Sequence, residues 1–188
     1  MDGIIIPVLG VILLIAVVTD IRSMRIPNWL TFPAMLMGLG YHTAMRGLDG
    51  LLFSAGGLAL GGALMLLPFI LRVMGAGDVK LMAAAGAFLG TRGVLSAFIW
   101  TSLAGGLYAL VVLLFHLPQL MAILRAVVAS VRFMSVTGKL SYIPATKDAR
   151  LPRLCYGVAI AAGTTFSMLL SSGLLPEAWF PVQWLTAL

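Results

Sequence analysis

The chain is a succession of long apolar runs separated by short stretches that carry most of the charged and turn-forming residues. A transmembrane helix needs about 20 predominantly apolar residues to cross the hydrocarbon core of a bilayer. Reading for such runs predicts six helices, at Ile4–Val18, Trp29–Ala44, Leu51–Leu71, Val79–Leu89, Val94–Phe115 and Leu154–Leu175. The apolar segment Gln119–Met134 carries Arg125 and Arg132 on one helical face and predicts a further amphipathic helix in the membrane interface.

The composition supports the bilayer as the solvent of this protein. Of the 188 residues, 61% are hydrophobic and only 10% are charged, and the mean hydropathy is +1.09. So little polar surface excludes an ordinary soluble domain. Six crossings and short loops use the whole length, so residues 1–188 are predicted to form a single all-α integral membrane domain. The first run follows Asp2 rather than a basic segment, so it is expected to be a retained helix and not a signal peptide.

The basic residues predict how the chain is oriented. The first, third and fifth loops between the predicted helices hold ten Lys and Arg residues, and the second and fourth loops hold only Arg46 and Arg92. By the positive-inside rule the odd loops face the cytoplasm of a plasma (inner) membrane protein, with both termini outside. The run Val79–Leu89 would form a helix of only about 17 Å, so whether it fully spans is left open. Basic residues scattered between apolar runs do not indicate nucleic-acid binding.

Two of the six acidic residues stand out by position. Asp20 and Asp78 fall at the cytoplasmic ends of the first and fourth predicted helices, whereas the other four acids lie in tails or loops. A pair of carboxyl groups is the minimum equipment of an aspartic hydrolase, in which one activates water and the other polarises the carbonyl. Each acid also has a structural interpretation, because Asp78 could cap its helix and Asp20 could be an interfacial anchor paired with Arg22. Gly75 and Gly77 are expected to allow positive φ values and close backbone approach.

The segments around these acids resemble a known family. Residues 20–28, DIRSMRIPN, resemble the DxRxxxIPN segment of type IV prepilin peptidases, and residues 75–81, GAGDVKL, are similar to their GxGDxKL segment. Residues 156–161, YGVAIA, are similar to the family's PYGxAIA segment, with Cys155 where proline is usual. The resemblance implies a membrane aspartic peptidase that removes leader peptides from prepilin-like substrates at the cytoplasmic face. It implies that Asp20 and Asp78 are the catalytic pair.

The resemblance is to the short, peptidase-only branch of the family, as in tight-adherence (Flp-type) pilus systems or in archaeal pilin and flagellin systems. Methyltransferase activity is not expected, because members that methylate usually carry an additional N-terminal segment, often with CxxC pairs. Arg22 and Lys80 are expected to tune the carboxylates, contact substrate backbone or anchor the inner face. Pro27 and Asn28 are expected to start the second helix, with Asn28 as its cap. No cofactor or metal is expected; the predicted partners are prepilin-like proteins and membrane lipids.

Two alternatives remain at this stage. Asp20 and Asp78 could relay protons or bind a cation in a non-enzymatic carrier or pilus-assembly scaffold, since intramembrane acids are functional by default. An intramembrane peptidase of the presenilin type shares the GxGD chemistry, but the DxRxxxIPN segment argues against it. For a water-activating pair, cleavage is expected to survive serine- and thiol-directed reagents.

Helix ends also predict how the two acids divide their labour. Asp20 lies at a helix C-terminus, where the macrodipole disfavours an anion, and Asp78 lies at a helix N-terminus, where it favours one. A shared proton is therefore expected on Asp20, with Asp78 as the base.

The predicted helices are also expected to pack closely in one place. Four glycines lie on the third run and should let neighbouring helices approach each other: Gly56, Gly57, Gly61 and Gly62.

Overall fold

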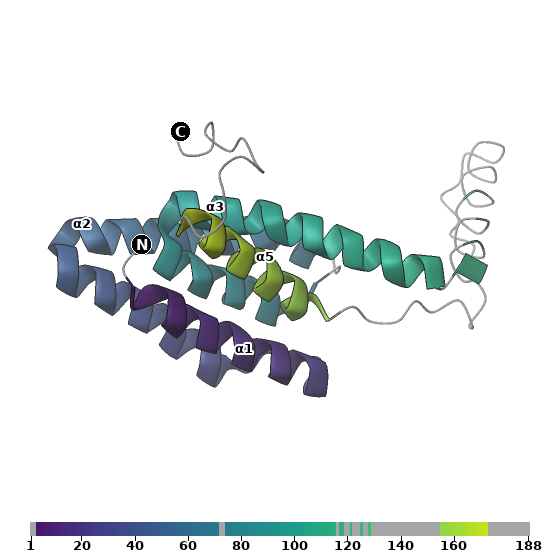
Figure 1. The fold of residues 1–188 in the computed structure, drawn as a ribbon, viewed down its shortest axis with the longest axis horizontal. Helices are drawn as coiled ribbons and strands as arrows, with labels where there is room; N and C mark the ends of the chain where they lie inside the picture. Colours follow the sequence, from purple (N-terminus) through teal and green to yellow (C-terminus); the bar gives the residue numbers. More distant parts are fainter. Residues whose placement is uncertain are drawn as a thin grey trace. The chain divides into compact units, whose positions relative to one another are not determined.

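A computed structural model describes residues 3–71, 74–115 and 155–172, together with positions 117, 118, 121, 125 and 128. The described residues form helices and turns without strands: α1 (Ile5–Ser23), α2 (Asn28–Ile70), α3 (Ala76–Phe115) and α5 (Tyr156–Ser171) (Figure 1). The predicted all-α class is confirmed. The predicted interfacial helix at Gln119–Met134 lies almost entirely outside the described residues. Two compact units divide the chain, residues 1–105 with 155–188 and residues 106–154, and the site described below belongs to the first.

Each of the two long helices is interrupted by one glycine with a left-handed backbone. Gly47 breaks α2 (φ 59°, ψ −134°), and Gly90 breaks α3 (φ 70°, ψ −175°). His42 and Ser54 lie on opposite sides of Gly47, yet they bind the adjacent carbonyls of Phe88 and Ala87. The chain therefore reverses direction at Gly47, and α2 consists of two antiparallel segments, 28–46 and 48–70 (Figure 1).

The same reasoning shows a reversal in α3. A Cβ atom on Gly61 would meet both Met82 and Val94, which lie on opposite sides of Gly90. α3 is therefore divided into segment 76–89 and segment 91–115. The breaks fall between the second and third, and between the fourth and fifth, of the predicted apolar runs.

Among the described residues, three helices are long and apolar enough to cross a membrane: α1, α2 and α3. The shorter α5 is also apolar. α1 continues five residues beyond the predicted end at Val18, so Asp20 lies within its last turn rather than after it. The number of crossings stays a prediction.

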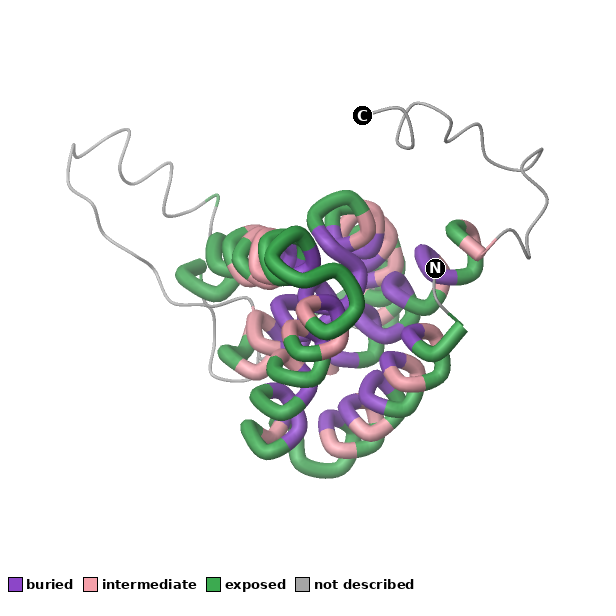
Figure 2. Tube along the Cα trace, turned by 90° about the vertical axis from the view of Figure 1, so that its left-hand side faces the viewer, coloured by how far each residue is buried: buried purple, intermediate pink, exposed green. Residues whose placement is uncertain are grey.

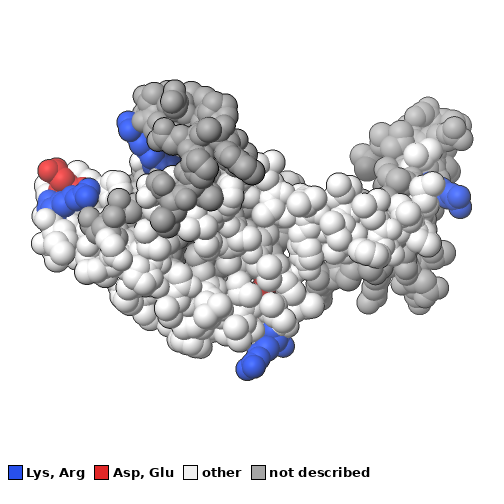
Figure 3. Space-filling model, in the orientation of Figure 1, with Lys and Arg blue, Asp and Glu red and all other residues white. Residues whose placement is uncertain are grey.

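The distribution of side-chain sizes is that of a protein surrounded by lipid. Large apolar side chains point outward all along the helices, for example Leu36 and Leu67, which are 69% and 65% exposed. Buried positions form one stripe along most helices (Figure 2), and many of them are Gly, Ala, Ser or Thr packed among larger side chains such as Leu9 and Phe88. On the face shown in Figure 3 the described surface is almost uncharged apart from a few basic groups and an acidic group beside one of them. An apolar exterior around an interior rich in Gly, Ala, Ser and Thr fits helices that associate in a bilayer, where close packing replaces the hydrophobic effect between helices.

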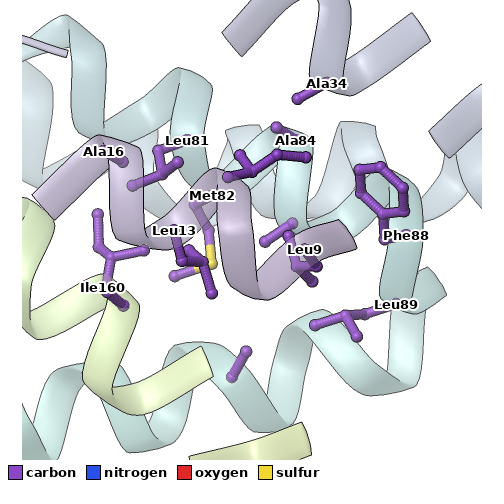
Figure 4. Close-up of a cluster of buried hydrophobic side chains, with 14 of the residues drawn as sticks. Leu9, Leu13, Ala16, Ala34, Leu81, Met82, Ala84, Phe88, Leu89 and Ile160 are labelled. Atoms are coloured by element: carbon purple, nitrogen blue, oxygen red, sulfur yellow. The ribbon is translucent and has the colours of Figure 1, made fainter. Parts of the chain in front are cut away.

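Segment 76–89 lies at the centre of the core. Every residue from Leu81 to Gly90 is buried. Side chains of α1 and α5, such as Leu13 and Ile160, pack against one side of this segment, and Ala34 of α2 approaches from another (Figure 4). The predicted short fourth helix is thus enclosed by its neighbours rather than by lipid.

Glycines let the segments of α2 approach this central helix. A Cβ on Gly57 would collide with the backbone of Gly86 and Gly90, and a Cβ on Gly38 would lie 2.9 Å from the carbonyl carbon of Ala87. A Cβ on Gly61 would lie 2.5 Å from the carbonyl oxygen of Met82. The expected close approach at the glycines of the third run is confirmed for Gly57 and Gly61.

Candidate active site

The two aspartates predicted from sequence lie at the same end of the helical unit. A hydrogen bond from Gly157 joins Asp20 in the last turn of α1 to the first turn of α5. In the turn between α1 and α2, Ile26 packs against Gly77, next to Asp78 in the first turn of α3. The C-terminus of α1 and the N-termini of α2, α3 and α5 therefore lie together at a common site that contains both carboxylates.

Asp20 is held by contacts at both its backbone and its side chain. Its carbonyl oxygen accepts the N–H of Met24, the residue with left-handed backbone (φ 49°) that ends α1. Its side chain is only 6% exposed. One carboxylate oxygen, Oδ2, accepts the backbone N–H of Gly157 at 2.9 Å. Asp20 is thus a buried carboxylate and not an exposed interfacial anchor.

Asp78 is the third residue of α3 and is 7% exposed. Its Oδ2 accepts the N–H of Gly75 at 3.0 Å, and its own N–H donates to the carbonyl of Gly75 at 3.1 Å. An acid at the third helical position that binds back to the residue before the helix is the reciprocal half of a capping box. Asp78 therefore stabilises the start of α3 without occupying the cap position that the structural interpretation of the sequence gave it.

The expectation of positive φ values at Gly75 and Gly77 is wrong, because among the described glycines only Gly47 and Gly90 have a positive φ. Gly77 serves close approach instead. A Cβ there would lie 3.0 Å from the Cβ of Ile26 and 3.3 Å from its backbone nitrogen. The absence of a side chain thus lets the turn after α1 rest on the first turn of α3.

A second contact joins the same two segments. The Lys80 Nζ donates a hydrogen bond to the Asn28 Oδ1 at 2.8 Å and also lies 5.1 Å from the ring centroid of Phe32. The expectation that Asn28 caps α2 is wrong: Pro27 occupies the cap position, and no side chain caps the helix. The Asn28 side chain turns to Lys80 because the packing of Ile26 on Gly77 brings the two chain segments together.

The remaining supporting residue, Arg22, has an exposed side chain. Among residues 3–71, 74–115 and 155–172, neither Asp20 nor Asp78 forms an ion pair, so the pairing of Asp20 with Arg22 is not found there. No group of three His, Cys, Asp or Glu side chains suited to a metal ion occurs in this described part of the chain.

The two carboxyl groups lie close enough to interact electrostatically with each other and with neighbouring groups. Asp78 lies within electrostatic range of Asp20, and the Cys155 thiol lies within range of both. Each carboxylate accepts one backbone N–H through Oδ2, and the described residues supply no hydrogen bond to either Oδ1. Two buried carboxyl groups in mutual range can share a proton, so one can act as an acid and the other as a base.

Sequence reasoning missed the contribution of α5. Gly157 binds Asp20, and Tyr156 lies within electrostatic range of Asp78 and packs over Gly105 in segment 91–115. The resemblance of residues 156–161 to a family segment was the available signal. It did not indicate which side chain this segment would contact, because Gly157 and Asp20 are 137 positions apart.

The fold and the site together define a helical protein with an apolar exterior and a pair of buried carboxylates at one end. Over residues 7–110, more than half of the chain, the sequence matches the model of the type IV leader peptidase family, and the matched part contains both aspartates. The chain belongs to this family, and it is a peptidase. Comparison with curated proteins and with solved structures gave no match. The resemblance found in the motifs is confirmed.

Proposed function

We propose that this protein is a membrane aspartic endopeptidase that removes leader peptides from prepilin-like substrates, with Asp20 and Asp78 as the catalytic pair. The observation that carries the proposal is the junction of the two motif segments. Ile26 on Gly77 and Lys80 on Asn28 hold the end of α1 against the start of α3, and each segment contributes one buried carboxylate. Membership of the leader peptidase family supports the substrate class.

The reaction needs one proton shared by the pair. The ionised carboxylate takes a proton from a water molecule, whose oxygen attacks the scissile carbonyl carbon, while the protonated carboxyl donates a hydrogen bond to the carbonyl oxygen. The C–N bond of the resulting intermediate then breaks, and the leaving amine receives a proton from the pair. Because each Oδ2 is engaged with a backbone N–H, each Oδ1 is available for water or substrate.

The proposal includes the orientation in the membrane. The predicted excess of basic residues in the odd loops puts the site at the cytoplasmic face, where the leader of a prepilin would lie, with both termini outside. Reporter fusions after Arg25 and Lys80 should indicate the cytoplasm, and a fusion after Arg46 should indicate the outside. A cytoplasmic signal at Arg46 would separate the site from its substrate and contradict this part.

Cleavage of a synthetic prepilin by the purified protein in detergent tests the catalytic pair. Asp20→Asn and Asp78→Asn should each abolish cleavage while the protein still folds, because neither carboxyl can perform both roles. Asp49→Asn is the matched control, since it removes an exposed acid near the break at Gly47. Activity should also persist in the presence of a chelator. Robust cleavage by either site variant, or loss with chelator that zinc restores, would overturn the mechanism.

The proposal keeps the peptidase-only character expected from the sequence. Mass spectrometry of the mature product should therefore show a free, unmethylated N-terminus when the methyl donor is supplied. A product heavier by one methyl group would contradict it.

A further inference from the structure

The first turn of α5 reaches the site through a backbone group rather than a side chain. The N–H of Gly157 donates to the Asp20 Oδ2 at 2.9 Å, in a buried position. Gly157 is the second residue of α5. The first N–H groups of a helix have no acceptor within the helix, so this donor is available to Asp20 without breaking a helical hydrogen bond.

Residue 157 has no room for a side chain. A Cβ there would lie 2.8 Å from the Asp20 Oδ2 and 3.2 Å from both its Cβ and its Cγ. All three atoms belong to Asp20, so any larger residue at this position must displace that side chain. A short hydrogen bond from the backbone to the carboxylate is thus possible only with glycine.

Further contacts fix the N-terminus of α5 in this position. Gly163 lies directly against the backbone of Thr101, and the Ser167 Oγ donates to the Ser96 Oγ at 2.9 Å. Ile160 is fully buried in the core cluster that includes Leu13 of α1 (Figure 4). α5 is therefore positioned by packing on α1 and on segment 91–115, independently of Asp20.

We propose that Gly157 is a positioning residue of the active site, whose N–H holds the Asp20 Oδ2 so that Oδ1 is turned toward the catalytic water. The positive end of the α5 dipole also offsets the unfavourable field at the C-terminus of α1. α5 thereby sets both the orientation of Asp20 and the charge balance of the pair. This inference rests on the proposed function of Asp20.

Replacement of the amide by an ester isolates this hydrogen bond. Glycolic acid in place of Gly157 puts an ester oxygen where the N–H was and adds no side chain. The matched control is 2-hydroxy-3-methylbutanoic acid in place of Val158, which removes the bond from its N–H to the Cys155 carbonyl at 3.3 Å in the same turn. A hydrogen bond to a charged group corresponds to about tenfold in rate, so we expect kcat to fall about tenfold for the ester at 157 with KM within about twofold. The ester at 158 should stay within about twofold of the wild type.

Equal losses for the two esters, or full activity for the ester at 157, would overturn the proposal. Gly157→Ala should lower kcat further, because its Cβ displaces the Asp20 carboxylate.

A readout without cleavage separates this proposal from the proposed function. In an Asp78→Asn background, infrared difference spectra of the Asp20 carboxyl should shift when the ester replaces the amide at 157. An unchanged band would refute the contact between Gly157 and Asp20. A shifted band, together with cleavage by the separate Asp20→Asn variant, would support the contact and refute the catalytic role of Asp20.

Discussion

The two ends of segment 76–89 are built in different ways. At the site end, Asp78 lies in the first helical turn, Gly75 is exposed, and the neighbouring contacts are single: one glycine N–H, the Ile26 side chain and the amide of Asn28. At the opposite end, every residue up to Gly90 is buried and backbone lies directly on backbone. One end leaves carboxylate oxygens available for chemistry, whereas at the other end Ser54 and His42 bind the carbonyls of Ala87 and Phe88.

The opposite end shows how a short helix can stop inside an apolar environment. Segment 76–89 is only about 20 Å long, and the break at Gly90 removes the partners of its last carbonyls. The Ser54 Oγ donates to the Ala87 carbonyl at 2.6 Å, and His42 lies with its Nε2 2.9 Å from the Phe88 carbonyl. Because a carbonyl only accepts, the His42 Nε2 carries the proton in this contact. Side chains of α2 thus cap the segment, as a bilayer interior requires.

The comparison teaches that stability and chemistry are separated along one helix. Substitutions at the opposite end should reduce the free energy of unfolding and leave kcat of the folded fraction unchanged. Substitutions at the site end should reduce kcat, with a smaller loss in the free energy of unfolding. Four experiments test this separation.

The largest effect is expected from a matched pair of glycine substitutions. In Gly57→Ala the new Cβ collides with backbone of Gly86 and Gly90, which cannot yield, and this should cost about 3 kcal/mol or more. In Gly77→Ala the new Cβ would lie 3.0 Å from the Cβ of Ile26 and 3.3 Å from its backbone nitrogen, a milder overlap than in Gly57→Ala that a small shift of the turn relieves, so the cost should be about 1 kcal/mol, with a clear loss of kcat.

Unfolding in detergent, followed by circular dichroism, measures these stabilities. Gly40→Ala is the control because its Cβ would meet nothing within 4 Å. Equal stability of Gly57→Ala and Gly40→Ala would break the comparison.

The second experiment removes the caps at the opposite end. His42→Ala leaves the Phe88 carbonyl unsatisfied and opens space beside the Phe53 ring, which should cost about 3 kcal/mol. Ser54→Ala removes a smaller group and should cost about 1 kcal/mol. The same unfolding assay, combined with kcat per folded molecule, checks both. A fall in kcat for His42→Ala without a change in stability would show that this end takes part in catalysis.

The third experiment uses Cys155, which lies two residues before Gly157 and within electrostatic range of both carboxylates. The sequence-based expectation that cleavage survives thiol-directed reagents stays a prediction, and the position of Cys155 argues against it. A maleimide on Cys155 should block the site and reduce cleavage about tenfold or more, even though the thiol is not the nucleophile. Cys155→Ser should cleave and resist the reagent. Inhibition of that variant would show that the reagent acts elsewhere, because the chain has one cysteine.

The smallest effect is expected at the Lys80–Asn28 hydrogen bond. Lys80→Ala and Asn28→Ala should each lower kcat about threefold, because the contact only steadies the junction of the two motif segments. If the two residues act through their mutual hydrogen bond, kcat of the double variant should be no lower than kcat of the less active single variant. Multiplied losses in the double variant would indicate separate roles, for instance direct contact of Lys80 with substrate.

The sequence by itself determined the helical class, the positions of the apolar runs and the two acids at their ends, because these depend on neighbours within a few residues. The two motif segments around Asp20 and Asp78, taken together, were enough to indicate the family. The breaks at Gly47 and Gly90 were also readable as the gaps between apolar runs. The local sequence pattern therefore predicted the helices and indicated Asp20 and Asp78 as the candidate catalytic residues.

Only the tertiary structure decided what each carboxylate contacts. Helix ends alone predicted that Asp20 would carry the shared proton, because it lies at the C-terminus of α1. The structure brings the N-terminus of α5 to the same carboxylate, so both acids accept one N–H from the start of a helix and the local argument loses its basis. Asn28 was likewise predicted to cap its own helix, but packing of Ile26 on Gly77 turned it to Lys80. Contacts between positions far apart in sequence leave no periodic signal, and they arise only when the helices pack.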